Sequence, residues 1–224
     1  MNYQFYQPFS GVVRHLIIIN VLMFVGTYVL LGDPHWTISE DGREMADLGR
    51  MQLAAFIPGS THFQPYQILT HMFMHGDLMH LAFNMLSLYF FGPMVEMVFG
   101  PKRFLFYYLY CGIGSYLLYN GVQYWELSSN GIDPMTFEGP MLGASGAIFG
   151  MYVAFAYHFP NQVMQLLFPP IALKAKYFVL IMAGLELFYG VRGYSTGVAH
   201  FAHLGGALFG FAILMYWNNF RFRH

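Results

Sequence analysis

Apolar runs of about 20 residues recur along the whole chain and limit its fold more than any other feature. A helix of that length and composition can cross a lipid bilayer. Apolar residues make up 57% of the chain and charged residues 9%, whereas soluble domains carry about 25% charged residues. We therefore expect an all-α integral membrane protein with a single domain over residues 1–224. The runs predict six spanning helices, at 13–31, 71–92, 102–122, 142–159, 176–192 and 198–217.

The net charge and the cysteine content exclude several kinds of partner and site, and the longest connection between the runs predicts one further element. The net charge of −1 implies neither nucleic acid nor an acidic surface as a partner. Cys111, the one cysteine, lies in an apolar run, which excludes an internal disulfide and a cysteine-based zinc site. The longest connection, 32–70, predicts an interfacial amphipathic helix, because its apolar side chains follow helical spacing at Met45, Leu48, Met51 and Ala55.

The lysine and arginine residues indicate how the predicted spans are oriented. With the N-terminus inside, seven of the ten fall on one side: Arg14, Lys102, Arg103, Lys174, Lys176, Arg221 and Arg223. The other side receives Arg43, Arg50 and Arg192. The positive-inside rule therefore predicts cytoplasmic N- and C-termini. The second, fourth and sixth spans then begin at the outer face, where each of them carries polar residues.

A serine opens the fourth span within the string Gly143-Ala144-Ser145-Gly146, which extends to Gly150. The first N–H groups of a helix have no acceptor within the helix, so a serine there can bring a hydroxyl and an oxyanion-binding N–H together. The glycines allow a substrate or a second helix to approach closely. Taken alone, the string favours a helix-capping serine beside a packing motif.

A histidine near the start of the sixth span lies on a stripe of small residues. His203, Gly206 and Gly210 share one helical face, so this face can approach another helix closely. An ionisable residue inside a span is a functional candidate, because its uncompensated burial costs several kcal/mol. Taken by itself, His203 is interpreted equally well as a functional residue or as a hydrogen-bonded histidine of the core. His200 lies about 60° from the stripe and is interpreted as structural or interfacial.

Polar side chains also share one face of the second span. His80 and Asn84 are four residues apart, and Ser87 continues their stripe. Two side-chain donors aimed at one point could stabilise a developing oxyanion. The alternative for them is an interhelical polar network that only fixes packing. For His71 and His75, packing is the preferred interpretation.

Three strings resemble the signature motifs of the rhomboid intramembrane serine proteases. They are His75-Gly-Asp-Leu-Met-His80-Leu-Ala-Phe-Asn84, Gly143-Ala-Ser145-Gly146-Ala-Ile-Phe-Gly150 and His203-Leu-Gly205-Gly206-Ala-Leu-Phe-Gly210. Glu96 followed by Gly100 also resembles the family's pattern. The resemblance extends from the second span to the sixth. It implies the basic prokaryotic form, a six-helix bundle in a bacterial plasma (inner) membrane with an interfacial first loop.

The resemblance implies a role for each matching residue. Ser145 would be the nucleophile, and His203 would be the general base and later the general acid. His80, Asn84 and the N–H of Ser145 would form the oxyanion hole. No third acidic member is expected, so the pair would be a dyad, without a metal or cofactor. The expected partners are the lipid bilayer and single-pass membrane proteins, cleaved near the outer interface.

Some residues depart from the family's usual pattern or stand outside it. Tyr66-Gln67 in the first loop stands where many relatives have Trp-Arg, which bears on how that loop docks on the bilayer. Phe149 stands where some relatives place a tyrosine on the catalytic histidine, so it keeps the ring and loses the hydroxyl. The fifth span is expected to move aside for the substrate. Its Glu186 is interpreted as a protonated or hydrogen-bonded carboxyl packed against a neighbour, in preference to a catalytic residue.

The residues also leave two other functions open. Ten histidines fit a metal transporter or sensor, with ligands among His71, His75 and His80 or His200 and His203. Against this, no carboxylate or cysteine completes a ligand set at tight spacing, and no HExxH motif is present. The other alternative is a catalytically silent rhomboid relative that only binds membrane proteins. The retention of both Ser145 and His203 argues against it.

Overall fold

Helices make up most of the chain that the structure describes. The computed structural model describes residues 11–31, 37–38, 44–45, 52–137, 139–165, 171–192 and 199–221. Within these residues the long helices are α1 (Gly11–Leu31), α4 (Leu78–Phe99), α5 (Pro101–Ser129), α6 (Ser145–His158), α7 (Ala175–Arg192) and α8 (His200–Arg221). The short elements are β1 (Thr37–Ile38), β2 (Glu44–Met45), α3 (Gln67–Thr70), the 3-10 helices η1 (His71–Phe73) and η2 (Pro134–Thr136), β3 (Val163–Gln165) and β4 (Ala172–Lys174).

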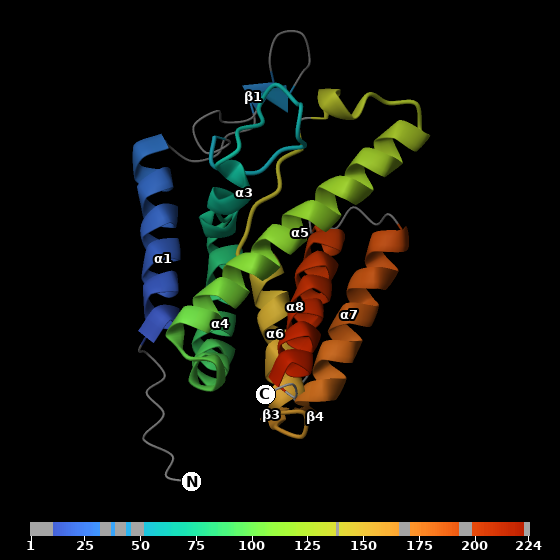
Figure 1. Ribbon diagram of the computed structural model, residues 1–224. Coiled ribbons are helices and arrows are strands. Elements are labelled where there is room, and N and C mark those ends of the chain that lie inside the picture. The colour runs from blue at the N-terminus through green and yellow to red at the C-terminus, as the bar shows by residue number, and fades with distance from the viewer. Residues whose placement is uncertain are drawn as a thin grey trace.

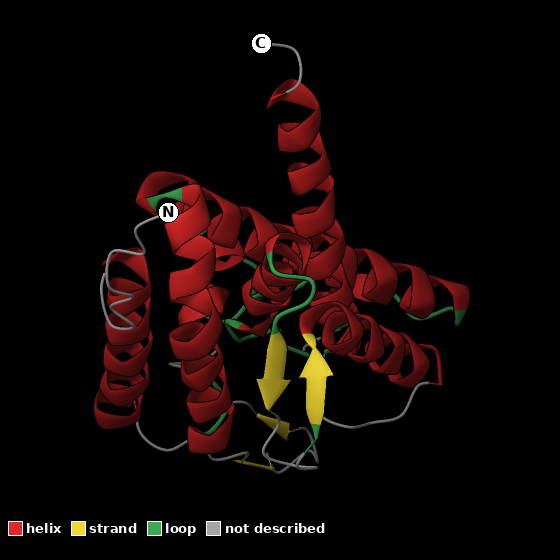
Figure 2. Cartoon of the chain, turned by 90° about the horizontal axis from the view of Figure 1, so that it is seen from below, coloured by secondary structure: helices red, strands yellow, loops and turns green. Residues whose placement is uncertain are grey.

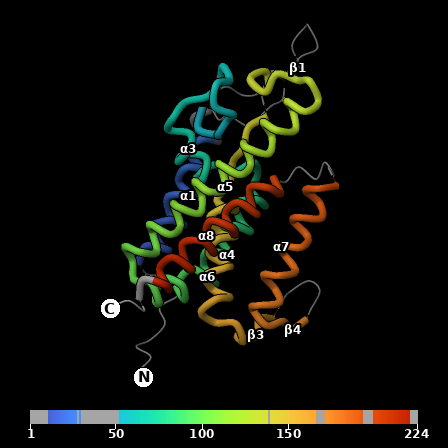
Figure 3. The backbone as a smooth tube through the Cα atoms, turned by 45° about the vertical axis from the view of Figure 1, so that its right-hand side comes forward, coloured from blue at the N-terminus to red at the C-terminus, as the bar shows by residue number. Residues whose placement is uncertain are grey.

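The long helices lie side by side and alternate in direction (Figure 1). We call the end that carries β1, β2 and η2 the upper end, and the end that carries β3 and β4 the lower end. Helices α5, α6 and α8 pack on one another, α1 packs on α4, and α7 lies at one edge against α8 (Figure 3). The antiparallel pair β3–β4 lies at the lower end of the helices (Figure 2). Because the long helices alternate in direction, α4, α6 and α8 all begin toward the upper end.

The long helices overlap the predicted ranges, but α4 lies about two turns further along the chain than predicted. Asp77 sets its start, because its extended backbone (φ −152°, ψ 174°) cannot continue a helix and its carboxylate accepts the N–H of His80 at 2.8 Å. Gly100 sets its end with φ +75°. The helix continues through Pro93 because apolar residues such as the buried Val95 still face the core beyond it.

Two of the described helices are long and apolar enough to cross a membrane by length and composition, Leu78–Phe99 and His200–Asn219. The apolar stretch Gly11–Thr27 is shorter. Helix α6 has 14 residues, and α7 carries Lys176, Glu186 and Arg192. Helix α5 is rich in tyrosine and glycine, which lowers its mean hydropathy.

Glycines let α6 and α8 meet through their backbones. A Cβ at Gly206 would overlap the carbonyl group of Gly146, and a Cβ at Gly210 would lie 3.0 Å from the Cα of Gly150. The predicted stripe of small residues beside His203 therefore faces another helix, as expected. Because the backbones touch, the start of α6 is held close to His203.

The described parts of the first loop do not form the predicted interfacial helix. Met45 belongs to β2, which pairs with β1, and the backbone of Ala55 pairs with Met141 through two hydrogen bonds of 2.8 Å. Leu48 and Met51 lie outside the described residues. The prediction is wrong for Met45 and Ala55, because backbone pairing, with nearby Thr37 in the first case and distant Met141 in the second, outweighs the helical spacing of apolar side chains.

Gln67 holds the first loop together from inside. Its side chain is buried, and its Nε2 donates to the carbonyls of Gln52 and His62 at 3.1 and 2.9 Å. Its Oε1 accepts the N–H of Gln64 at 2.9 Å. The neighbouring Tyr66 is 48% exposed. Of the two residues that depart from the family pattern, Gln67 stabilises the loop and Tyr66 faces outward.

Glu96 of α4 holds the first turn of α1. Its Oε1 accepts the N–H of Val12 at 2.8 Å, and its Oε2 accepts the N–H of Val13 at 3.0 Å. These N–H groups have no acceptor within α1, and a negative charge is favourable at a helix N-terminus. Glu96 therefore ties the first long helix to the rest of the bundle.

We expect Glu96→Gln to lower the thermal midpoint of unfolding. Glutamine offers one acceptor oxygen instead of two and carries no charge, and a hydrogen bond to a charged group contributes about 1.5 to 3 kcal/mol. Thermal unfolding of the purified variant in detergent measures the effect. A midpoint equal to that of the wild type would show that this contact does not stabilise the fold.

Candidate active site

Ser145 and His203 meet where the first turns of α6 and α8 pack together. Ser145 is the first residue of α6, and His203 lies in the first turn of α8. The Nε2 atom of His203 lies 2.7 Å from the Oγ atom of Ser145. The histidine is buried and the serine is partly exposed. The arrangement gives an accessible hydroxyl a base within hydrogen-bond distance.

Phe149 lies flat against the ring of His203. The ring centroids are 4.3 Å apart and the ring planes differ by 6°. Phe149 lies one turn after Ser145 on α6, so the same helix that carries the hydroxyl also holds the plane of the imidazole. The stacking predicted for this position is confirmed.

Glu186 of α7 contacts two histidines of α8. Its Oε1 lies 2.9 Å from the Nδ1 of His203, and its Oε2 lies 2.6 Å from the Nδ1 of His200. The interpretation of Glu186 as a hydrogen-bonded carboxyl is confirmed. The expectation that no acidic side chain joins Ser145 and His203 is wrong, because three side chains form one chain of hydrogen bonds.

One residue outside the three motifs already indicated this contact in the sequence. Glu186 is the acidic residue of α7, which is otherwise mostly apolar, and a buried carboxylate needs donors. His200 and His203 are three residues apart, so both lie near one side of α8. The sequence could not show that α7 turns its carboxyl toward that side.

His80 brings a hydrogen-bond donor to the same place from α4. Its Nδ1 accepts the N–H of Gly76 at 3.4 Å, so the proton of the neutral ring is on Nε2. A Cβ at Gly143 would lie 2.9 Å from this Nε2 and 3.5 Å from the Oγ of Ser145. Gly143 has φ +124° and no side chain, which lets the His80 ring lie close to the Gly143 backbone beside Ser145.

Asn84 is buried one turn beyond His80 on the same face of α4. Its Nδ2 donates to the carbonyl of His80 at 3.0 Å, which uses one of its two amide hydrogens. Ser87, the next member of the stripe, donates to the carbonyl of Phe83 at 2.8 Å and accepts the hydroxyl of Tyr152 at 2.6 Å. Ser87 therefore links α4 to α6, whereas the hydrogen bond described for Asn84 stays within α4.

His71 and His75 precede α4 and lie outside the long helices. The Nδ1 of His71 lies 2.9 Å from the carbonyl oxygen of Gln67, and the His75 ring packs edge-on against His80 at 5.1 Å. Burial lowers the pKa of His71 to about 4 and the pKa of His75 to about 3. Both rings are therefore neutral at pH 7, as packing residues in an apolar setting should be. Within the described residues, no three His, Cys, Asp or Glu side chains form a group suited to a metal ion.

Comparisons with known proteins agree with the motifs around this site. Residues 62–219 match the family described as "Rhomboid domain". "Rhomboid protease AarA" of Providencia stuartii is 32% identical over 143 residues, which cover 62% of this chain and 51% of that protein. "Rhomboid-like protease 3" of Toxoplasma gondii is 30% identical over 165 residues, which cover 74% of this chain and 56% of that protein.

A human relative extends the comparison to mitochondria. "Presenilin-associated rhomboid-like protein, mitochondrial" of Homo sapiens is 32% identical over 164 residues, which cover 68% of this chain and 39% of that protein. The chain thus spans about half, or less, of the length of these relatives.

Proposed function

This chain belongs to the rhomboid family, and we propose that it is an intramembrane serine endopeptidase that acts through Ser145 and His203. The observation that carries the proposal is the 2.7 Å contact between His203 Nε2 and Ser145 Oγ. A serine hydroxyl is a weak nucleophile unless an adjacent base accepts its proton. The names of two relatives, which call them proteases, support the same reaction class.

In the proposed reaction, His203 carries one proton back and forth. Ser145 Oγ bonds to the carbonyl carbon of the substrate peptide, its proton moves to His203 Nε2, and the carbonyl electron pair moves to the oxygen. The imidazolium then gives this proton to the leaving amine as the C–N bond breaks. Water attacks the acyl-enzyme in the same way, which releases the acid product and returns the proton to Ser145.

Three donors stabilise the negative oxygen in this proposal. They are the N–H of Ser145, the Nε2–H of His80 and the second amide hydrogen of Asn84. The close approach of His80 to Gly143 supports the role of His80, because its Nε2 and the Ser145 Oγ both lie near the Cβ position of Gly143. The first N–H groups of α6 have no acceptor within the helix, which supports the role of the Ser145 backbone.

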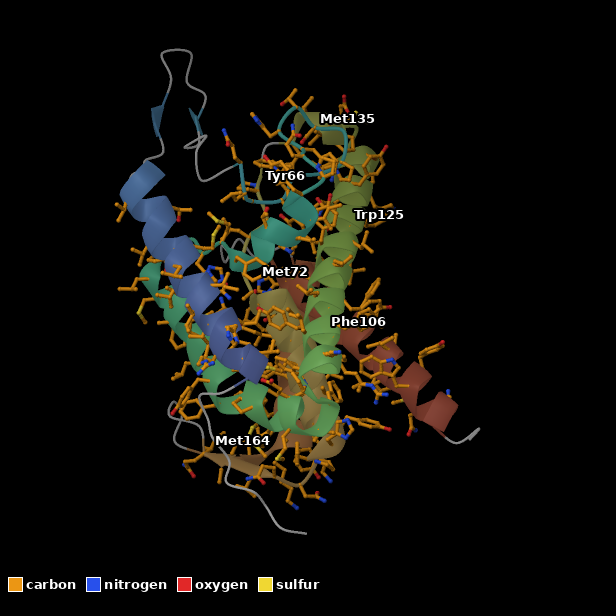
Figure 4. The ribbon with its side chains drawn as sticks, turned by 60° about the vertical axis from the view of Figure 1, so that its left-hand side comes forward. Tyr66, Met72, Phe106, Trp125, Met135 and Met164 are labelled. Atoms are coloured by element: carbon orange, nitrogen blue, oxygen red, sulfur yellow. The ribbon has the colours of Figure 1, made fainter. Side chains whose placement is uncertain are left out.

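We further propose that all six long helices cross the membrane. Large hydrophobic side chains are exposed on each of the six, for example Val29, Phe83, Phe106, Tyr157, Leu180 and Leu208. In Figure 4 the exposed aromatic residues Tyr66 and Trp125 lie at the upper end, and Met164 lies at the other end. Aromatic side chains of this kind collect where the bilayer meets water.

The length of α6 supports a site below the outer surface of the membrane. Its 14 residues are about 21 Å long, whereas the hydrocarbon layer is about 30 Å thick. If α6 ends at the inner face, Ser145 lies roughly 10 Å below the outer one. A substrate helix must unwind locally there to present an extended peptide bond. We therefore propose single-pass membrane proteins with small or helix-breaking residues near the outer interface as substrates, entering past α7.

The proposed orientation places the lower end and both termini in the cytoplasm. Lys174 is exposed at the lower end and Asn130 is exposed after α5 at the upper end, and Cys111 is fully buried. In intact bacterial cells, an impermeant maleimide should therefore label Asn130→Cys and spare both Lys174→Cys and the wild type. If position 174 is labelled and position 130 is spared, the proposed topology is wrong and the site opens toward the cytoplasm.

Reconstitution tests the proposed activity. The purified chain and a tagged single-pass protein are placed in the same liposomes, and the cleavage products are identified by mass spectrometry. We expect cleavage close to the outer end of the substrate helix, with the same rate after EDTA treatment. A rate that EDTA abolishes and zinc restores would favour a metal-dependent protein, and an intact substrate with every single-pass protein tried would favour a silent relative.

A further inference from the structure

The carboxylate of Glu186 divides its oxygens between two histidines of the neighbouring helix. Its Oε1 lies 2.9 Å from the Nδ1 of His203, and its Oε2 lies 2.6 Å from the Nδ1 of His200. The side chains of Glu186, His200 and His203 are 10%, 10% and 11% exposed. Helix α7 buries only Ala175 and Glu186 among its 18 residues. A buried carboxylate with a histidine nitrogen at each oxygen thus joins α7 to α8.

The direction of these hydrogen bonds fixes the protons on the histidine rings. An ionised carboxylate can only accept, so the Nδ1 of His203 must carry the proton. The Nε2 of the same neutral ring is then an acceptor, and this is the atom that lies 2.7 Å from the Ser145 hydroxyl. The ring is therefore held in the tautomer that a general base needs.

We propose that Glu186 is a positioning residue for the reaction, which holds His203 in its base tautomer and stabilises the imidazolium formed when Ser145 gives up its proton. This inference rests on the proposed protease function. In the resting site, Glu186 contacts a neutral ring. After proton transfer, the same 2.9 Å contact joins opposite charges, so it becomes stronger as the reaction proceeds.

The contact also connects the base to the helix that the substrate is proposed to pass. Glu186 lies on α7, at the edge of the bundle, whereas His200 and His203 lie one turn apart on α8 (Figure 3). His200 occupies the second oxygen and is itself stacked against Tyr189 of α7, with centroids 5.6 Å apart. A displacement of α7 away from α8 would remove the partner of His203 Nδ1.

The charged and titratable groups around His203 come from three helices. Glu186 faces it from α7, His200 shares the carboxylate on α8, and His80 of α4 is close enough to interact electrostatically. Phe149 covers one face of the ring from α6. Glu186 is the group that supplies negative charge at the Nδ1 atom.

The test compares Glu186→Gln with wild type in the liposome cleavage assay. Glutamine keeps the size of the side chain and can still accept one hydrogen bond, but it has no charge. We expect kcat to fall about 10²- to 10⁴-fold, as when other serine hydrolases lose the acid beside their histidine. KM should change little, and the acid limb of the kcat profile should move to lower pH, because the imidazolium loses its negative neighbour. Glu186→Asp, which keeps the charge, should retain the wild-type pH profile and recover part of kcat.

Glu96→Gln is the matched control. It removes a partly buried carboxylate that also accepts two hydrogen bonds, but Glu96 lies about 24 Å along α4 from His80. Its thermal midpoint should fall while kcat per folded molecule and the pH profile stay at wild-type values. If Glu186→Gln behaves like this control, Glu186 is structural and the proposal is overturned.

Ser145→Ala in the same assay separates this inference from the proposed function. Continued cleavage by Ser145→Ala would reject the function itself. Loss of cleavage in Ser145→Ala, together with a wild-type kcat and pH profile in Glu186→Gln, would reject only the role of Glu186.

Nitrogen NMR of the wild-type chain with labelled histidine provides a measurement that does not depend on a variant folding. The ring of His203, assigned by its loss in His203→Ala, should carry its proton on Nδ1. A proton on Nε2 would overturn the proposal.

Discussion

Replacing Ser145 by alanine should lower the rate of substrate cleavage by about 10⁴- to 10⁶-fold, and His203→Ala should have nearly the same effect. The reason is that the hydroxyl and the imidazole, 2.7 Å apart, act as one unit, so losing either one disables both. The double variant should therefore be no slower than the single variants. Single-turnover cleavage in liposomes, with enzyme in excess, measures all three rates.

The pattern of these rates separates a catalytic pair from two unrelated residues. If the losses multiply in the double variant, Ser145 and His203 contribute independently and do not form a nucleophile and base. Ser145→Ala removes one oxygen from a partly exposed side chain, so its thermal midpoint should stay close to that of the wild type. A large fall in the midpoint would assign the lost activity to unfolding.

Replacing Asn84 by alanine should lower turnover by roughly 10- to 1,000-fold with little change in apparent affinity, as loss of one oxyanion donor does in other enzymes. The amide has a second hydrogen that its bond to the His80 carbonyl leaves available. The effect is specific to the transition state, because the negative oxygen exists only there. Turnover, apparent affinity and thermal midpoint of the purified variant give the three quantities.

Ser87→Ala is the matched control for Asn84→Ala. It truncates the next polar residue of the same stripe, which links α4 to the hydroxyl of Tyr152. Polar contacts between membrane helices are worth about 0.6 kcal/mol on average, so this variant should lose some stability and keep its turnover. If Asn84→Ala also keeps full turnover and only loses stability, Asn84 is a packing residue.

The sequence predicted the helices better than their boundaries. Apolar runs locate a helix because burial and lipid exposure both require apolar side chains, but the ends depend on single residues. The backbone angles of Asp77 and Gly100 set the two ends of α4, which therefore lies further along the chain than predicted. The first loop could not be predicted, because the pairing of Ala55 with Met141 joins segments far apart in the sequence.

The site shows the same division between local and distant information. The glycine stripe beside His203 and the ring of Phe149 could be predicted, since both follow from spacing along one helix. The role of Gly143 depends on where His80 of another helix points. The two histidine partners of Glu186 depend on how α7 is rotated against α8, which no pattern within α7 reports.

The most direct test of Ser145 as an activated nucleophile is covalent labelling with a fluorophosphonate, followed by peptide mapping of the purified protein. These reagents react with a serine whose proton a neighbouring base can accept. We expect a single adduct on Ser145, absent in Ser145→Ala and strongly reduced in His203→Ala. A folded protein that remains unlabelled, or an adduct on another serine that persists in Ser145→Ala, would contradict the assignment of Ser145 and His203 as nucleophile and base.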